Sequence, residues 1–100
     1  MNATKRCLLI DDIRDLAADV IARNYFEGIK QLKLNGPWDL LLLDHDLASF
    51  IDSKEYTGYD IMCWLEGNQE YLPSEIICVS SNPVGAQRIK TVIDRLYRKQ

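Results

Sequence analysis

The sequence has few cysteines and no long apolar run, and both shortages narrow the class of protein. It has three cysteines, with no CxxC spacing, which argues against a disulfide framework and against a zinc site. No run approaches the ~20 apolar residues of a membrane span, and the N-terminus lacks the apolar core of a signal peptide. We therefore expect one cytoplasmic domain over residues 1–100, with reduced and buried cysteines.

The sequence also has fewer basic than acidic residues, 12 lysines and arginines against 15 aspartates and glutamates. The formal net charge is −3 and the pI is near 5.0, so a general electrostatic grip on nucleic-acid backbone is not expected. Hydrophobic residues make up 47% of the chain and charged residues 27%, which is ordinary for a soluble globular protein. The composition therefore predicts a folded domain that neither enters membranes nor binds DNA in general.

Apolar runs alternate with helical patterns along the chain, and there is no linker, repeat or low-complexity segment. Four apolar runs predict strands at residues 6–12, 18–24, 38–44 and 74–81. Three amphipathic segments predict helices that begin after the capping residues Asn24, Thr57 and Asn82. Residues 15–23 fit a helix starting near Asp15 as well as a strand, and the sequence leaves this choice open.

Strands that are apolar throughout and alternate with helices predict a parallel sheet covered on both faces. The predicted fold is a small, doubly wound α/β domain of about four strands. Ligand sites in such sheets lie outside the carboxyl ends of the strands. Polar residues follow three of the predicted strands there, namely Asp11, Asp12, Asp44, His45, Asp46, Ser80, Ser81 and Asn82. We therefore expect these side chains to share one rim.

Three of the acids at this rim predict a cation site. Asp11, Asp12 and Asp44 would repel each other and raise one another's pKa values unless a cation lay among them. Mg²⁺ suits a set of oxygen ligands and leaves coordination positions for water or phosphate oxygens. The backbone amides of residues 82–85 open the last predicted helix toward the same rim, which favours an anion. The combination predicts Mg²⁺ and a phosphate group.

Several of these residues also have a plainer interpretation. Asp11 or Asp12 could cap the turn that follows the first strand, and Asn82 is well explained as a helix cap. A lone histidine such as His45 is commonly a surface or structural residue, and Gly85 could serve packing alone. The joint occurrence of Asp44 with the earlier aspartate pair is what favours a site.

Four motifs occur in order along the chain: "IDDIR" (10–14), "LDHDL" (43–47), "TGYDIMCWL" (57–65) and "SSNPVGAQRI" (80–89). They resemble the cyclic-phosphate processing receiver domains, which are relatives of the receiver domains of response regulators. The resemblance implies a truncated receiver (flavodoxin-like) fold and hydrolysis or transfer at cyclic phosphates of RNA ends or nucleotides. An ordinary receiver would also have a fifth strand ending in a lysine, for which no room remains after Tyr97.

The resemblance implies roles for individual residues. Carried over from the family, the residues that would line the site are Asp12, Arg14, Asp44, His45, Asp46, Ser80, Asn82 and Gly85. From the resemblance together with the acids at the rim, we expect metal ligands at Asp11, Asp12 and Asp44, catalytic residues at His45, Asp44 and Asp46, and substrate-binding residues at Arg14, Ser80, Asn82 and Gly85. Val79 stands where family members often have a second histidine, so His45 would act alone or with an aspartate. Two alternatives are a non-catalytic module that binds a phospho-ligand or a protein partner, and a receiver phosphorylated on Asp44.

Overall fold

The computed structural model describes residues 5–98, so the outermost parts of the predicted 1–100 domain lie outside the described residues. Its elements, in chain order, are β1 (Cys7–Ile10), β2 (Val20–Ala22), α1 (Tyr25–Asn35), β3 (Leu40–Leu43), β4 (Ser49–Ile51), β5 (Lys54–Tyr56), α2 (Gly58–Gly67), the 3-10 helix η1 (Gln69–Tyr71), β6 (Glu75–Cys78) and α3 (Pro83–Tyr97).

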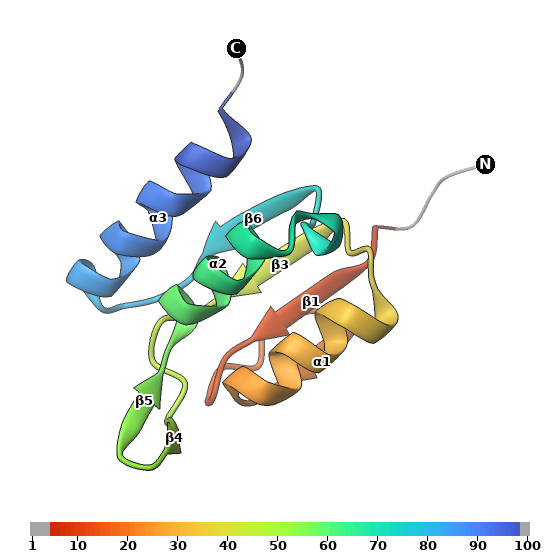
Figure 1. The fold of residues 1–100 in the computed structure, drawn as a ribbon. Coiled ribbons are helices and arrows are strands. Elements are labelled where there is room, and N and C mark those ends of the chain that lie inside the picture. The colour runs from red at the N-terminus through yellow and green to blue at the C-terminus, as the bar shows by residue number, and fades with distance from the viewer. Residues whose placement is uncertain (1–4, 99–100) are drawn as a thin grey trace.

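Four of the strands form one parallel sheet in the order β2-β1-β3-β6 (Figure 1). Leu41 lies opposite Leu8 on one side and opposite Ile76 on the other, so the apolar strands are in register. This arrangement confirms the predicted α/β class and parallel sheet. The strand alternative is correct for residues 20–22, and no helix begins near Asp15.

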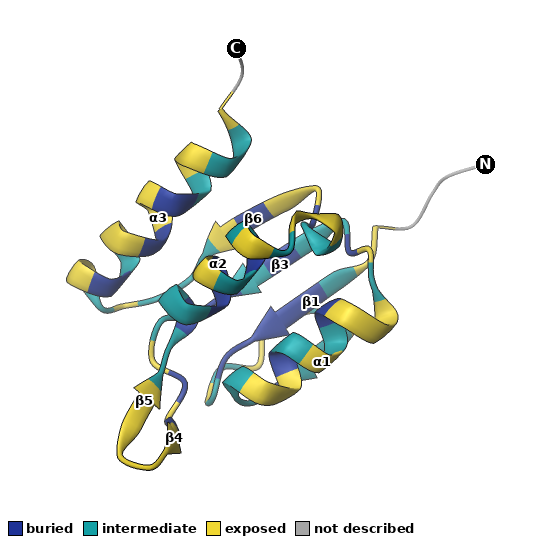
Figure 2. Cartoon of the chain, in the orientation of Figure 1, coloured by how far each residue is buried: buried dark blue, intermediate teal, exposed yellow. Residues whose placement is uncertain are grey.

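A single apolar core joins one face of the sheet to all three helices. Side chains alternate between the two faces of a strand, and the core takes every second residue. It contains Leu8, Ile10, Ala22, Leu32, Leu41, Leu43, Ile61, Met62, Leu65, Ile76, Ile89 and Val92. The helices therefore share one face. The residues that alternate with the core set belong to the other face, where Leu9 is fully buried and Ile77 has 43% of its surface exposed. Figure 2 shows buried and exposed residues along each strand.

The sequence predicts helical cover on both faces, and the difference lies in the connection from β1 to β2. Residues 11–19 make this parallel connection without a helix. The carboxylate of Asp11 accepts hydrogen bonds from the amides of Ile13 and Arg14, both at 2.9 Å. An aspartate that bonds the backbone two and three residues ahead favours a turn over a continuing strand or helix.

The predicted helix starts are confirmed, with one change in detail. The Asn24 side chain accepts the Glu27 amide at 2.9 Å. The spacing of Asn24 and Glu27 also predicts a capping box, but the Glu27 carboxylate accepts the amide of Arg23 instead of that of Asn24, so the box is not closed. The capping box at the start of α2 is complete. The Thr57 side chain accepts the backbone amide of Asp60, and the Asp60 carboxylate accepts the backbone amide of Thr57.

A hairpin that the sequence analysis missed lies between β3 and α2. β4 and β5 pair antiparallel, with Ile51 opposite Lys54. Asp52 and Ser53 form its tip with φ angles of 50° and 67°, the left-handed region that a two-residue hairpin turn requires. The turn contains no glycine, which is the residue that most often signals such a turn.

Two further expectations concern exposure. Cys7, Cys63 and Cys78 are free thiols, but the prediction that all are buried is wrong, because Cys63 is exposed and the other two are half-buried. Within residues 5–98, no helix combines the length and the apolar character that crossing a membrane would require.

Gly58, at the start of α2, packs directly against the backbone that follows β3. Adding a single methyl group at this position should therefore lower the stability of the fold. A Cβ at position 58 would lie 2.0 Å from the carbonyl oxygen of Asp44. We expect Gly58→Ala to lower the free energy of unfolding by about 1–3 kcal/mol, because the backbone after β3 must shift. Urea unfolding measures the change.

The control for this prediction is Gly67→Ala at the other end of α2, where, apart from the adjacent residues and the backbone of the helix itself, no atom lies within 4 Å of the new Cβ. Alanine is the better helix former by up to about 1 kcal/mol, so this variant should be neutral or slightly more stable. Similar losses of stability in both variants would contradict the close contact.

Candidate functional site

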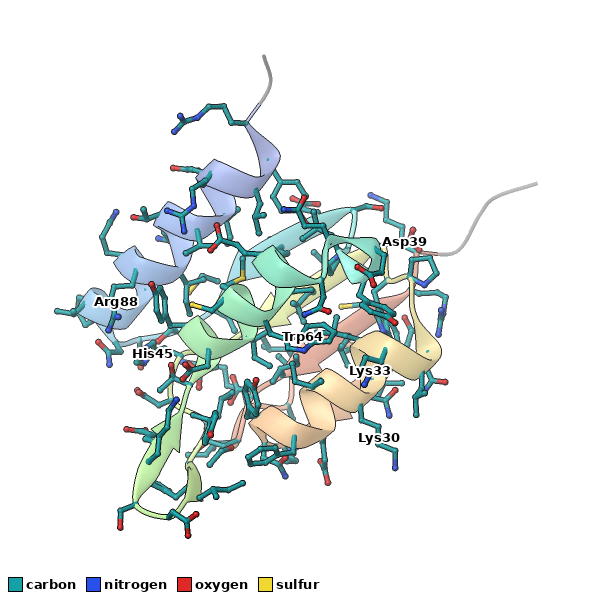
Figure 3. The ribbon with its side chains drawn as sticks, viewed as in Figure 1. Lys30, Lys33, Asp39, His45, Trp64 and Arg88 are labelled. Atoms are coloured by element: carbon teal, nitrogen blue, oxygen red, sulfur yellow. The ribbon has the colours of Figure 1, made fainter. Side chains whose placement is uncertain are left out.

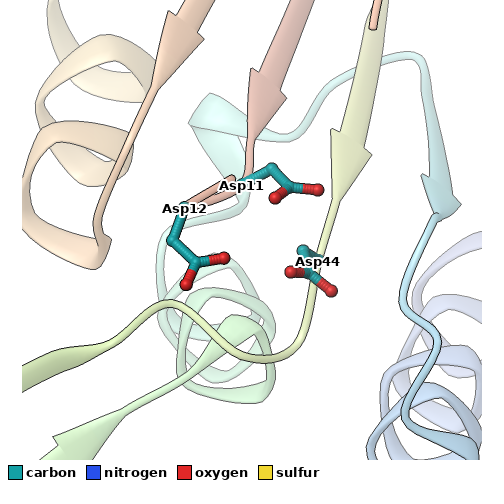
Figure 4. A group of neighbouring side chains, drawn as sticks. All are labelled: Asp11, Asp12 and Asp44. Carbon is teal, nitrogen blue, oxygen red and sulfur yellow. The ribbon is translucent and has the colours of Figure 1, made fainter. Parts of the chain in front are cut away.

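Three aspartates meet at the carboxyl ends of two adjacent strands. Asp11 and Asp12 follow β1 directly, and Asp44 follows β3 (Figure 4). One carboxylate oxygen from each can be chosen so that all three lie within 4.8 Å of one another. They border a cavity of about 260 Å³ at the rim of the sheet. Its lining residues are Asp11, Asp12, Ile13, Arg14, Asp44, Asp46 and Ser81.

Arg14 is placed between two of these acids. Asp11 is 1% exposed and Asp44 is 6% exposed, and buried carboxylates require hydrogen-bonding or charged partners. The Arg14 guanidinium donates to Asp11 Oδ2 at 3.0 Å and lies 3.6 Å from Asp44 Oδ1. The protein's own cation therefore offsets part of the negative charge of the cluster.

The two buried acids have pKa values that move in opposite directions. Burial acts to raise the pKa of Asp11, but the amides of Arg14 and Ile13 and the Arg14 guanidinium outweigh it and hold this pKa below its usual range. Burial, followed by the negative charge of Asp11, raises the pKa of Asp44, while the amide of His45, the Arg14 charge and the Ser80 side chain oppose the rise. Asp44 is thus the carboxylate with the weaker compensation.

His45 lies next to the cavity, near the start of α3, but does not line it (Figure 3). Its backbone amide donates to Asp44 Oδ1 at 2.8 Å, and its Nδ1 lies 2.9 Å from Asp46 Oδ1. The ring packs on Gly85, where a Cβ would lie 2.3 Å from the ring Cγ. Asp46 does line the cavity, so the histidine stands behind an aspartate rather than at the surface of the site.

The N-terminus of α3 is less open to an anion than the sequence predicts. The amide of Gly85 donates to the Asn82 side chain at 3.0 Å, and the amide of Asn82 donates to Ser80 Oγ at 3.0 Å. Pro83 has no amide hydrogen. In the described part of the chain, Val84 is the residue of this first turn whose amide has no acceptor. The cap therefore occupies most of the donors that were expected to hold phosphate.

The structure brings together part of the set named from the sequence. Asp11, Asp12, Arg14, Asp44 and Asp46 line one cavity. His45 and Ser80 lie one step behind it through their contacts with Asp44 and Asp46, and Asn82 and Gly85 hold these neighbours in place.

Two further residues line the cavity: Ser81, which the sequence placed at the rim without a role of its own, and Ile13, which the sequence did not mark. Ser81 follows Ser80, and which of two adjacent serines faces a rim depends on where the strand ends. The predicted strand runs to residue 81, whereas β6 ends at Cys78. Ile13 carries no polar group, and no feature of the sequence marks it.

One family of known proteins matches this chain. The family, described as the cyclic-phosphate processing receiver domain, matches residues 6–95, a range that includes every residue of the cavity. No curated protein and no solved structure matches the chain significantly.

The opposite pKa directions predict opposite effects of removing the two buried charges. The folded-state pKa of Asp44 is raised, so its ionisation costs stability, and the cost grows as the pH rises through and above this pKa. In metal-free buffer, Asp44→Asn should therefore raise the Tm at pH 7, with a gain that shrinks toward acidic pH. Asp11 has a lowered pKa and its ionised form stabilises the fold, so Asp11→Asn should lower the Tm at pH 7.

Thermal unfolding from pH 4 to pH 8 measures both changes. Glu55 is an exposed residue of β5, so Glu55→Gln serves as the control and should change the Tm little at any pH. A loss of stability in Asp44→Asn at neutral pH would show that the Asp44 carboxylate is structural.

Proposed function

The chain belongs to the family of cyclic-phosphate processing receiver domains, and on this premise we propose that it binds Mg²⁺ at the acidic rim and opens cyclic phosphates of nucleotides or RNA ends. The observation that carries the proposal is the meeting of Asp11, Asp12 and Asp44 at the ends of two adjacent parallel strands, beside a cavity of about 260 Å³. This position is where parallel α/β sheets bind their ligands.

The donor set fits Mg²⁺. The ion takes oxygen ligands at about 2.0–2.1 Å and is commonly held by one or two carboxylates together with water and phosphate oxygens. The three candidate oxygens lie within 4.8 Å of one another, and they would have to move closer together to share one ion, because two oxygens bound to one Mg²⁺ are at most about 4.2 Å apart. Asp44, whose pKa is raised by burial and by Asp11, is the carboxylate that a cation would stabilise most. When bound, Mg²⁺ would neutralise the charge that develops on the phosphate oxygens.

Arg14 and Asp46 supply the other groups that the reaction needs. The Arg14 side chain is 35% exposed and faces the cavity, so its guanidinium could turn from Asp11 toward a phosphate oxygen. Asp46 would accept the proton of the attacking water as the water oxygen bonds to phosphorus. The ring P–O bond then breaks, and its oxygen takes up a proton from solvent. His45 and Asn82, which contact Asp46, would orient that carboxylate.

A second candidate function is a module that binds a phosphate-bearing ligand without turning it over. Arg14 already compensates part of the acidic cluster, and the Gly85 amide is occupied by the Asn82 cap. Val79 also provides no second acid/base group. These features favour binding without turnover, and a measurement of ring opening separates the enzyme from the binding module.

Binding of Mg²⁺ is tested by thermal shift and by calorimetric titration. We expect Mg²⁺ to raise the Tm of the wild type, because an ion that binds only the folded state stabilises it. Asp44→Asn should lose most of this shift. Arg14→Gln should bind Mg²⁺ more tightly than the wild type, since it removes a competing cation 3.0 Å from Asp11 and 3.6 Å from Asp44.

The exposed control variant Glu55→Gln should respond to Mg²⁺ like the wild type. Equal Mg²⁺ shifts in the wild type and in Asp44→Asn would place the ion elsewhere and remove the basis of the proposal.

Turnover is tested by ³¹P NMR with a mixture of 2′,3′-cyclic nucleotides and Mg²⁺. We expect ring opening by the wild type and a loss of about 10²–10⁴-fold in Asp46→Asn, the typical contribution of a positioned general base. His45→Asn keeps a donor close to the Nδ1 position and should lose less. Unchanged cyclic phosphate with the wild type, combined with Mg²⁺ binding, would select the binding module instead.

A further inference from the structure

The outer edge of β6 is open. This strand ends the sheet order β2-β1-β3-β6, and within residues 5–98 it pairs with β3 alone. The amide of Glu75 donates to the carbonyl of Asp39, directly before β3, at 3.1 Å, and the amide of Val79 donates to the carbonyl of Leu43 in β3 at 2.9 Å. Because successive backbone groups of a strand point to opposite sides, those of Ile76 and Cys78 point away from β3 to the free edge. No turn or cap bond in the described part of the chain uses them.

A groove runs beside this edge. Its volume is about 550 Å³, and it lies between β6 and α3. Its walls are Ile76, Ile77, Cys78, Gln87, Lys90, Ile93 and Asp94. Figure 1 shows α3 beside β6 rather than over the middle of the sheet, so the helix flanks the free edge without pairing with it. The groove therefore combines unpaired backbone groups with an apolar wall.

The edge lacks the usual protection against another strand. Proteins commonly guard edge strands with lysine, proline or a bulge. β6 reads "EIIC", with Glu75 as its one charge, and Ile77 has 43% of its surface exposed. On the facing wall, Lys90 and Asp94 form no ion pair among residues 5–98, whereas Arg95 on the same helix is paired with Glu66. The groove thus offers a free positive and a free negative group to an incoming chain.

We propose that an extended segment of a partner protein adds to the edge of β6 as a further strand. Its backbone would bond the N–H and C=O groups of Ile76 and Cys78, as in other cases of strand addition. One of its apolar side chains would pack on Ile93, and an acidic side chain would reach Lys90. This surface lies on a different strand from the acidic cluster, so the proposal does not depend on the metal or on turnover.

A second copy of the chain fits this edge less well than a single segment. Pairing of β6 with its own copy requires two-fold symmetry, which places both copies of α3 on the same side of the joined sheet. Each α3 flanks the edge that the other copy would occupy, so the two helices would compete for one space. An extended segment brings no such helix.

The experiment measures hydrogen exchange and ¹⁵N chemical shifts of the full chain. The probe is a peptide of about six residues, blocked at both ends, that alternates valine and threonine around one central glutamate. In the free protein, the amides of Ile76 and Cys78 should exchange much faster than that of Ile77. Millimolar peptide should slow both by about tenfold or more. The same peptide with alternate amides N-methylated should have no effect, because it cannot complete the ladder.

Charge reversal tests the contact with Lys90. Lys90→Glu should lower the affinity for the glutamate peptide by about two- to fivefold, the range expected for an exposed ion pair. The same variant should bind a peptide with lysine in place of the glutamate more tightly than the wild type does. Lys30 is exposed on α1, away from the groove, so Lys30→Glu should bind as the wild type does (Figure 3).

Three results would overturn the proposal. These are equal binding of the N-methylated peptide, unprotected Ile76 and Cys78 amides at millimolar peptide, and concentration-dependent self-association that protects these amides without peptide.

Discussion

Negative charge gathered at the ends of β1 and β3 is the constraint around which the rim is organised. Ile10 pairs with Leu43 in these parallel strands, so the residues that follow, Asp11 and Asp44, are brought together by the backbone pairing alone. Asp11 is stabilised by two backbone amides and by Arg14. Asp44 has less compensation and keeps a raised pKa. The sheet thus creates a charge imbalance that Arg14 reduces and that a divalent cation would reduce further.

The motifs that are far apart in the sequence meet around Asp44 and His45. Gly58 begins α2 against the carbonyl of Asp44, and its amide donates to the carbonyl of His45 at 2.8 Å. Gly85, in α3, leaves room for the ring of His45. Both glycines are therefore required by close approach and not by backbone angle, since no glycine in the described chain has a positive φ. Their role is to fix the acidic segment between two helices.

Much of the fold could be predicted because its signals are local. Continuous apolar runs gave the strands, and Asn24, Thr57 and Asn82 marked the helix starts with short side-chain bonds. The hairpin was missed because its turn, Asp52–Ser53, reaches positive φ without glycine. The placement of all three helices on one face depends on the missing helix between β1 and β2, which is a property of the connection and not of any strand.

The site was predictable as a set of acids and less so as a geometry. Strand order and the carboxyl-end rule identified Asp11, Asp12 and Asp44 together. Which of Ser80 and Ser81 faces the cavity, and whether His45 stands in front of or behind Asp46, depend on strand ends and ring packing that a sequence does not contain.

The hairpin of β4 and β5 has a consequence for how this domain could diversify. The segment leaves the rim after Asp46 and returns where Gly58 bonds His45, so its two roots lie together. A loop closed at its base can lengthen or shorten while the rest of the chain keeps its place, since doubling its length costs only ~0.6 kcal/mol in closure entropy. Evolution could therefore alter what lies above the acids by insertion and deletion at the hairpin, leaving the charge arrangement inherited and intact.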